Sequence, residues 1–138
     1  MKRKSSSARR SDCPIAYALD FVGDKWTLLV LRDLIMVRKR HFQELQSGTE
    51  GIATNILSDR LRRLAAAGMI TRRAAPGRGR RAVYAPSKKA LDLLPVLVEL
   101  VRWGTKYSPK SGAPPQLLRR LSEDRDGFIA ELRAAHGH

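Results

Sequence analysis

The sequence is poor in cysteine, in acidic residues and in aromatic side chains. The shortages of cysteine and of aromatic residues each exclude a class of protein, and the shortage of acidic residues leaves the chain strongly positive. A single cysteine, Cys13, cannot form a disulfide within the chain, which excludes a small secreted fold held by internal disulfides. Only 13 acidic residues stand against 27 lysines and arginines, so the formal net charge is +14. Aromatic residues make up 6% of the chain, too few for a typical RNA-binding module that stacks bases on exposed rings.

The sequence also lacks a long hydrophobic run. No stretch of about 18 or more apolar residues is present, and the basic N-terminus is not followed by the apolar core of a secretion signal. We therefore expect a soluble cytoplasmic protein, in a reducing compartment. The 138 residues fit one domain with extensions.

Catalytic and metal-binding patterns are equally scarce. The three histidines, His41, His136 and His138, have no metal-ligand spacing with Cys13, and no motif places a pair of acidic residues for catalysis. The segment Gly77-Arg78-Gly79 lacks the further glycine and the following helix of a phosphate-binding loop. We predict no enzyme activity, no metal site and no cofactor.

The net positive charge lies entirely before residue 111. Residues 111–138 contain four arginines and four acidic residues, so residues 1–110 carry the whole net charge. Because 43% of the residues are hydrophobic, the chain is not a disordered basic tail, and its charge belongs to the surface of a folded domain. Such a surface favours a polyanionic partner.

Composition divides the chain into three parts. Residues 1–11 are rich in serine and basic residues and predict a flexible arm, either solvated or in contact with DNA. Residues 12–107 predict the folded domain. Residues 108–138 begin with a proline-containing linker and continue as an amphipathic helical segment, which Gly127 is expected to interrupt. This extension suits either dimer contacts or packing against its own domain.

Helix signals organise the start of the domain. Cys13 precedes Pro14, which suits the first turn of a helix, and that helix ends at Gly23. It is apolar on more than one side, so either the core or a partner subunit should cover it. Asp24 is placed to cap the next helix, whose apolar residues recur at a helical period as far as Leu34.

A helix-turn-helix pattern follows. A short amphipathic helix containing Phe42 and Leu45 leads through a turn at residues 47–51 to a longer helix at residues 53–66. The longer helix is apolar on one side, whereas its polar side carries short hydrogen-bonding groups and then arginines, which can contact base edges in a major groove. The residues of this polar side are Thr54, Asn55, Ser58, Asp59, Arg62 and Arg63.

Arg60 belongs to the same helix but lies near its apolar side on a helical wheel. We expect its stem to pack on the domain and its guanidinium to pair with a carboxylate such as Asp33 or Glu44. For the polar side of the helix, the alternative to base contact is an ordinary solvated face.

A β-hairpin is predicted after this helix. Gly68 ends the helix, and residues 69–73 and 82–85 have the pattern of two antiparallel strands. Their connection carries arginines without an acidic neighbour, which suits contact with DNA phosphates or the minor groove. These arginines are Arg78, Arg80 and Arg81. Further candidates for phosphate contact form an earlier basic run, namely Arg38, Lys39 and Arg40.

A further helix is predicted after the hairpin. Ser87 is placed to cap it, it extends through Trp103, and Pro95 should kink or divide it. Both Trp26 and Trp103 are interpreted as core residues.

Several motifs together resemble the HxlR-type family of winged helix-turn-helix regulators of bacteria and archaea. They are Cys13-Pro14, Gly23-Asp24-Lys25-Trp26-Thr27-Leu28-Leu29 with Leu31-Arg32-Asp33-Leu34, Phe42-Gln43-Glu44-Leu45, Gly51-Ile52 followed by Leu57-Ser58-Asp59-Arg60-Leu61, and Trp103-Gly104. The resemblance covers about residues 13–107. It departs from the family pattern at residues 46–50, which lack the usual proline, and in the tail after Ser108.

The resemblance implies a mainly α-helical winged helix-turn-helix domain with a small β-hairpin, whose N-terminal and C-terminal helices form a homodimer interface. It implies a transcriptional regulator, repressor or activator, that binds a double-stranded DNA operator. Residues 53–66 would then occupy the major groove and residues 76–81 the backbone or minor groove. The alternative is a non-specific nucleic-acid-binding protein, of nucleoid or RNA-binding type, whose affinity falls with salt alike for every sequence.

The resemblance also raises a role for Cys13. Some members of the family sense oxidants or electrophiles through a cysteine near the N-terminus, and Cys13 matches that position. A helix N-terminus with Arg9 and Arg10 nearby favours the reactive thiolate. The effector would then be an oxidant or a small molecule. The alternative is a small buried cysteine with no sensing role.

Overall fold

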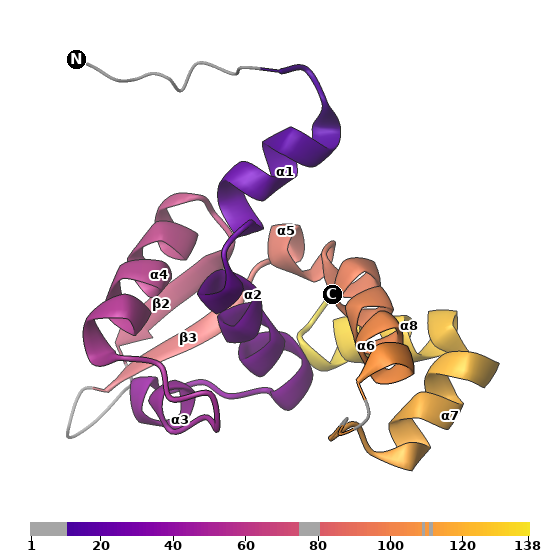
Figure 1. Cartoon of the computed structure of the whole chain (residues 1–138). Coiled ribbons are helices and arrows are strands. Elements are labelled where there is room, and N and C mark those ends of the chain that lie inside the picture. The colour runs from indigo at the N-terminus through magenta and orange to yellow at the C-terminus, as the bar shows by residue number, and fades with distance from the viewer. Residues whose placement is uncertain (1–10, 75–80, 109, 111) are drawn as a thin grey trace.

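Figure 1 presents the computed structural model, which describes residues 11–74, 81–108, 110 and 112–138. The described part is mainly helical with one hairpin. In chain order its elements are α1 (Pro14–Val22), α2 (Lys25–Arg32), the π-helical turn η1 (Asp33–Val37), α3 (Phe42–Gln46), α4 (Thr54–Ala66), β2 (Ile70–Ala74), β3 (Ala82–Pro86), α5 (Lys88–Leu91), α6 (Leu94–Tyr107), α7 (Pro115–Glu123) and α8 (Arg125–Ala135).

The helix boundaries follow from capping residues that the sequence predicts. Cys13 is the N-cap of α1, with Pro14 in the first turn. The Asp24 carboxylate caps α2, accepting hydrogen bonds from the Thr27 backbone N–H at 3.3 Å and from the Thr27 hydroxyl at 2.5 Å. Pro95 lies in the first turn of α6, so the predicted long helix is divided into α5 and α6.

The hairpin begins one residue later than predicted and pairs Ile70 with Pro86 and Arg73 with Val83. Successive side chains along a strand point to opposite faces, so the two faces of the hairpin can have different surroundings. Ile70, Tyr84 and Pro86 share one face and are buried against the domain, whereas Arg73 on the opposite face is exposed. We call the face that carries Arg73 and Val83 the outer face of the hairpin.

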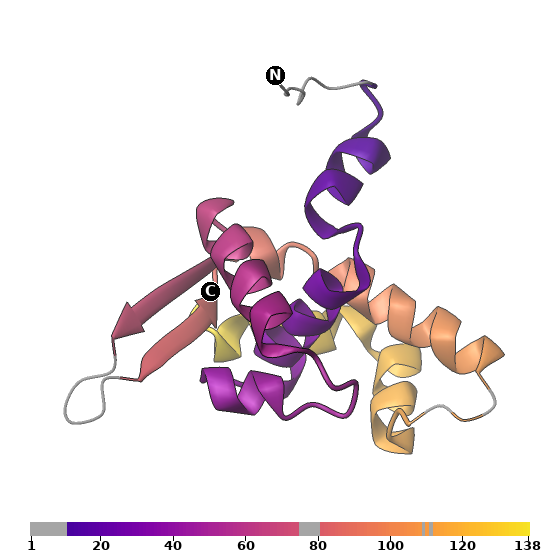
Figure 2. The same cartoon turned by 60° about the vertical axis from the view of Figure 1, so that its left-hand side comes forward.

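The core lies between α2, η1, α4, the hairpin and α6. Its fully buried side chains are aliphatic, as close packing without unpaired polar groups requires. The largest are Leu31, Leu34, Ile35, Leu57, Leu91, Leu94, Leu121 and Val98. Figures 1 and 2 show that α4 and the hairpin lie at one end of this core and that α6 and α7 lie at the other.

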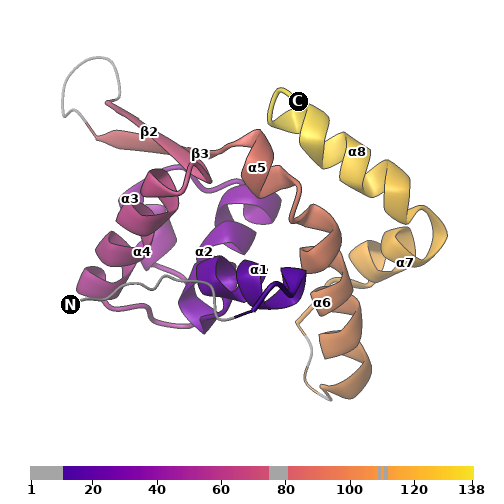
Figure 3. The same ribbon diagram turned by 90° about the horizontal axis from the view of Figure 1, so that it is seen from above.

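The C-terminal extension packs against its own chain, which is one of the two alternatives that the sequence left open. Leu121 and Ile129 are buried, and Figure 3 shows α7 and α8 beside α6. Arg125 pairs with Glu99 of α6 at 2.9 Å. At the far end of α8, the His136 Nε2 donates a hydrogen bond to the carbonyl of Ile35 at 2.9 Å.

The predicted interruption of the extension at Gly127 is wrong. The two helices separate at Asp124, which ends α7 and caps α8 by accepting a hydrogen bond from the Gly127 backbone N–H at 3.1 Å. Gly127 therefore lies inside α8. An added Cβ there would collide with the Asp124 carboxylate, so the glycine makes room for the cap.

α1 is not covered by the core, so the first of the two alternatives for its apolar residues is wrong and cover by a partner subunit stays a prediction. Val22 is its only buried residue, whereas Ile15 is 69% exposed and Leu19 is 56% exposed. In Figures 1 and 2 this helix projects away from the other elements. Trp26 packs against the core as predicted, but Trp103 is 67% exposed, so its interpretation as a core residue is also wrong.

Within the residues that the structure describes, no helix is both long enough and apolar enough to cross a membrane. Over the same residues, no group of three or more His, Cys, Asp or Glu side chains is arranged to hold a metal ion.

Candidate nucleic-acid interface

α4 presents a polar face to solvent because its apolar face is fully used by the core. Leu57, Leu61 and Leu64 are buried and lie against α2 and the hairpin. The opposite side carries Asn55, Ser58, Arg62 and Arg63, all of which are exposed. The helix thus has the amphipathic form that the sequence predicts, with amide, hydroxyl and guanidinium groups directed to solvent, where a partner can meet them.

Two of the predicted contact residues on α4 are occupied within the domain. The Asp59 carboxylate is half-buried and pairs with Arg62 at 2.8 Å and Arg63 at 3.0 Å. It therefore orients these two arginines and offsets part of their charge. The Thr54 hydroxyl accepts a hydrogen bond from the Gln46 side chain, which links the start of α4 to the end of α3.

Arg60 connects α4 to the N-terminus of α2. Its guanidinium pairs with Asp24 at 2.8 Å and with Asp59 at 2.7 Å, and its side chain is only 19% exposed. The prediction that Arg60 lies away from the polar face is confirmed, but the predicted partners, Asp33 and Glu44, are wrong. Both of those carboxylates are already engaged elsewhere.

The Asp24 carboxylate therefore serves two elements at once. Burial alone would raise its pKa, but hydrogen bonds from Thr27 and Arg60 outweigh that effect and lower the pKa below its ordinary value. The hydrogen bond to Asp24 correspondingly raises the pKa of Arg60. We call Asp24, Arg60 and Asp59 the α2–α4 bridge.

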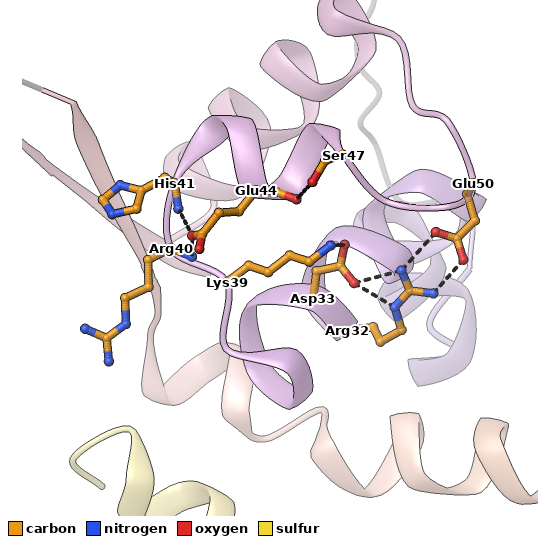
Figure 4. Close-up of polar contacts among 8 residues, drawn as sticks. All are labelled: Arg32, Asp33, Lys39, Arg40, His41, Glu44, Ser47 and Glu50. Atoms are coloured by element: carbon orange, nitrogen blue, oxygen red, sulfur yellow. Dashed lines mark hydrogen bonds and ion pairs between the residues drawn. The ribbon is translucent and has the colours of Figure 1, made fainter. Parts of the chain in front are cut away.

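Figure 4 shows a second polar cluster, made of Arg32, Asp33, Lys39 and Glu50. Arg32 binds both carboxylate oxygens of Glu50, at 2.9 and 3.0 Å, and its Nη2 lies 2.7 Å from an oxygen of the buried Asp33. Lys39 reaches the other oxygen of Asp33 at 3.2 Å. We call these four residues the Arg32 cluster.

The Arg32 cluster fixes the turn that precedes α4, because Glu50 lies in that turn and Arg32 lies in α2. The bidentate hydrogen bonds from Arg32 lower the pKa of Glu50 to about 2. In the same pair, the hydrogen bond to Glu50 raises the pKa of Arg32. No local pattern in the sequence indicates this pairing, since the two residues are 18 positions apart with no shared periodicity.

Glu44 is engaged at the start of α3. Its carboxylate accepts hydrogen bonds from the backbone N–H groups of Arg40 and His41, at 2.9 and 3.0 Å. These bonds lower the pKa of Glu44. The carbonyl of Arg40 in turn accepts a hydrogen bond from the Tyr84 N–H at 2.8 Å, which joins the helix-turn-helix to β3.

The predicted basic candidates divide into three groups. Arg38, Arg40 and Arg81 are exposed, whereas Lys39 is 20% exposed and directed to Asp33. Arg78 and Arg80 lie outside the described residues. The sequence patterns did not single out Arg72 and Arg73 as candidates, although both are exposed on β2. The sequence feature that could have identified them is their position as a pair shortly before a connection that contains three more arginines.

Cys13 lies at the N-cap of α1 and is exposed. The burial that the alternative assumed is therefore wrong, whereas a sensing role stays a prediction.

Comparison with known families decides what kind of domain this is. Residues 21–112 match the family described as HxlR-like helix-turn-helix. The chain belongs to the HxlR-like family. This confirms the resemblance drawn from the sequence motifs, and relatives of the chain are named as HTH-type transcriptional regulators.

Three similar proteins illustrate the relationship. An uncharacterized HTH-type transcriptional regulator of Mycobacterium tuberculosis, Rv3095, is 35% identical over 105 residues, which cover 76% of this chain but only 65% of that relative. The crystal structure of PA1607, a candidate transcription factor, is 33% identical with a TM-score of 0.69, covering 79% of this chain and 76% of its own. The oxidized form of the redox regulator HypR is 25% identical with a TM-score of 0.60, and the match covers 68% of this chain and 96% of HypR.

The α2–α4 bridge predicts a difference between two neighbouring arginines. Replacing Arg60 with methionine keeps the packed stem but leaves Asp24 and Asp59 without their shared partner, so the free energy of unfolding should fall by about 1–3 kcal/mol. The matched control is Arg62→Met on the exposed face, where the side chain is 72% exposed and the loss should stay below about 1 kcal/mol. Urea denaturation measures both, and equal losses would contradict the role of the bridge.

The Arg32 cluster predicts a pH dependence. A carboxyl whose pKa is lowered by folding contributes stability above its unfolded pKa and loses it as the pH falls through the folded value. Glu50→Gln should therefore be less stable than the unchanged protein at pH 7, and the difference should shrink between about pH 4.5 and pH 2. Urea denaturation across that range tests this, with Glu123→Gln on exposed α7 as control. A constant difference down to pH 2 would refute it.

Proposed function

We propose that this chain is a sequence-specific regulator that binds duplex DNA as a homodimer. α4 enters the major groove, and the hairpin contacts the neighbouring backbone or minor groove. The observation that carries the proposal is the exposed polar face of α4, where Asn55, Ser58, Arg62 and Arg63 stand opposite a fully buried apolar face. Amide and guanidinium groups can contact adenine and guanine in bidentate fashion, which gives such a face the means to read sequence.

Charge supports the same partner. Arg81 at the end of the hairpin connection is exposed, as are Arg72 and Arg73 on β2. We propose Arg81, together with Arg78 and Arg80 of the connection, for contacts with phosphates. Arg38 and Arg40 are weaker candidates for the same role, and Lys39 is the weakest because Asp33 already binds it. Contacts of this type raise affinity for any duplex and make it depend on salt.

Exposed apolar side chains support the homodimer. On α1, Ile15, Tyr17 and Leu19 are all more than half exposed, and on α6 Trp103 and Tyr107 are 67% and 62% exposed. Apolar groups gathered on two helices of one chain mark a surface that another protein covers. A second copy would bury both helices and set the distance between the two α4 helices, as a two-fold operator requires.

The DNA-binding proposal predicts two separate effects. After selection of bound duplexes from a random pool, Asn55→Ala or Arg62→Ala should reduce the preference for the selected duplex over a scrambled one, by about 1–3 kcal/mol for each base that the variant no longer binds. Arg81→Ala should weaken both duplexes alike and lower the slope of log affinity against log salt by about 0.9 for each phosphate that the variant no longer neutralises. Fluorescence anisotropy across salt concentrations measures both.

The control for these variants is Arg119→Ala, an exposed arginine on α7 that should change neither quantity. If the unchanged protein binds selected and scrambled duplexes equally, the non-specific nucleoid or RNA-binding alternative is correct instead. A uniform loss on every sequence would remove Asn55 and Arg62 from base contact.

We further propose that Cys13 makes the regulator responsive to oxidants or electrophiles. Its thiol is exposed at the start of α1, and HypR, to which the chain is similar, is a redox regulator. A disulfide between two Cys13 residues, or with a small thiol, would act on the helix that we assign to the dimer interface.

Oxidation provides the test of this role. Treatment with diamide should change the affinity of the protein for its selected duplex, a reducing thiol should restore it, and Cys13→Ser should abolish the response while leaving the reduced affinity unchanged. Since Cys13 is the only cysteine, mass spectrometry under non-reducing conditions identifies the product directly. An equal response of the Cys13→Ser variant would disprove the proposal.

A further inference from the structure

A basic pocket lies at the base of the hairpin, away from the exposed face of α4. It has a volume of about 210 Å³ and forms where the end of η1, the hairpin and the end of α8 meet. None of its lining residues in the described chain is acidic. The charged or titratable ones are Arg38, Lys39, Arg40, Arg73, Tyr84 and His136.

Three of these cations lack a counter-charge. Lys39 pairs with Asp33, but in the part of the chain that the structure describes no ion pair involves Arg38, Arg40 or Arg73. The acidic side chains of the helix-turn-helix region already have partners in the α2–α4 bridge, the Arg32 cluster or the α3 cap. Guanidinium groups around one small space repel each other, and an anion placed between them relieves that repulsion.

The walls of the pocket are held in place by backbone contacts. The N–H of Arg40 binds Glu44 and its carbonyl accepts from Tyr84, so Arg40 is fixed to both α3 and β3. On the other side, the His136 hydrogen bond to Ile35 and the 3.0 Å pair between Arg133 and Asp92 hold the end of α8. A site whose frame is fixed before binding loses little entropy when a ligand enters.

The pocket contains no residue of α4, although Arg38 and Arg40 are also weaker candidates for contact with DNA phosphates. It is lined by four successive residues of β3, 83–86, and by Arg73 of β2, which pairs with Val83. It also depends on His136, which lies beyond residues 21–112 that match the family. The pocket is therefore a feature of this chain with its C-terminal extension.

We propose that this pocket binds the phosphate group of a small solute, with Arg40 and Arg73 as its principal ligands and Arg38 beside them. Planar guanidinium groups suit phosphate oxygens, which they bind through paired hydrogen bonds. Drug-sized ligands occupy pockets of about 300–1,000 Å³, so the smaller volume here fits a phosphate with few further atoms. DNA backbone phosphate has the same chemistry, and the test separates the two sources.

The test is an NMR titration of the full chain with inorganic phosphate at constant ionic strength, following backbone amides and arginine Nε–H groups. The signals of Arg38, Arg40, Arg73 and His136 should shift together and saturate. Arg73→Gln and Arg40→Gln should each weaken this binding by about tenfold or more. Arg119→Gln is the matched control and should leave the binding unchanged. Thermal unfolding of each variant verifies that loss of binding does not reflect loss of folding.

Two outcomes would overturn the inference. Shifts that rise linearly without saturating, and that include Arg119 equally, would mean that phosphate only screens exposed charge. In a second arm, a short DNA duplex replaces inorganic phosphate; if the duplex shifts the pocket signals while phosphate does not, the pocket contacts the DNA backbone instead. Because the phosphate arm contains no DNA, its result does not depend on the proposed regulator function.

Discussion

The attachment of α4 to α2 is the constraint on which the rest of the interface depends. Leu57, Leu61 and Leu64 fix which side of α4 faces the core, and the ion pair between Arg60 and Asp24 fixes its position along α2. Since Asp24 also caps α2, one carboxylate joins α2 to α4 close to the end of α1.

The few acidic residues of the helix-turn-helix region have a structural role. The acids of the helix-turn-helix region are engaged internally, in caps and ion pairs that position its elements. They are Asp24, Asp33, Glu44, Glu50 and Asp59. The described arginines of β2 and of the end of the connection are left exposed without acidic partners, apart from the contact of Arg72 with the Tyr84 hydroxyl. Internal carboxylates thus shape the fold, and the unpaired arginines give its surface a strong affinity for anions.

Local signals predicted most of the fold, whereas long-range pairings lay beyond them. Capping residues, glycines and prolines act within a few positions, so the starts of α1, α2 and α4 and the place of the hairpin could be read from the sequence to within one residue. The partners of Arg60 could not, because several carboxylates were equally suitable until the helices were placed. The Arg32 cluster and the docking of His136 on Ile35 likewise join distant segments. The exposure of Trp103 shows that apolar periodicity identifies a contact face without identifying what covers it.

The central claim is that two subunits bind the duplex together, each contacting bases in the major groove through its α4. Methylation interference on a selected duplex tests it most directly, because methylated guanine N7 blocks contacts in the major groove alone. We expect interference in two segments about one helical turn apart, related by two-fold symmetry, with weaker contacts on the flanking backbone. Tight binding with no interference at any guanine of the selected site would contradict the claim.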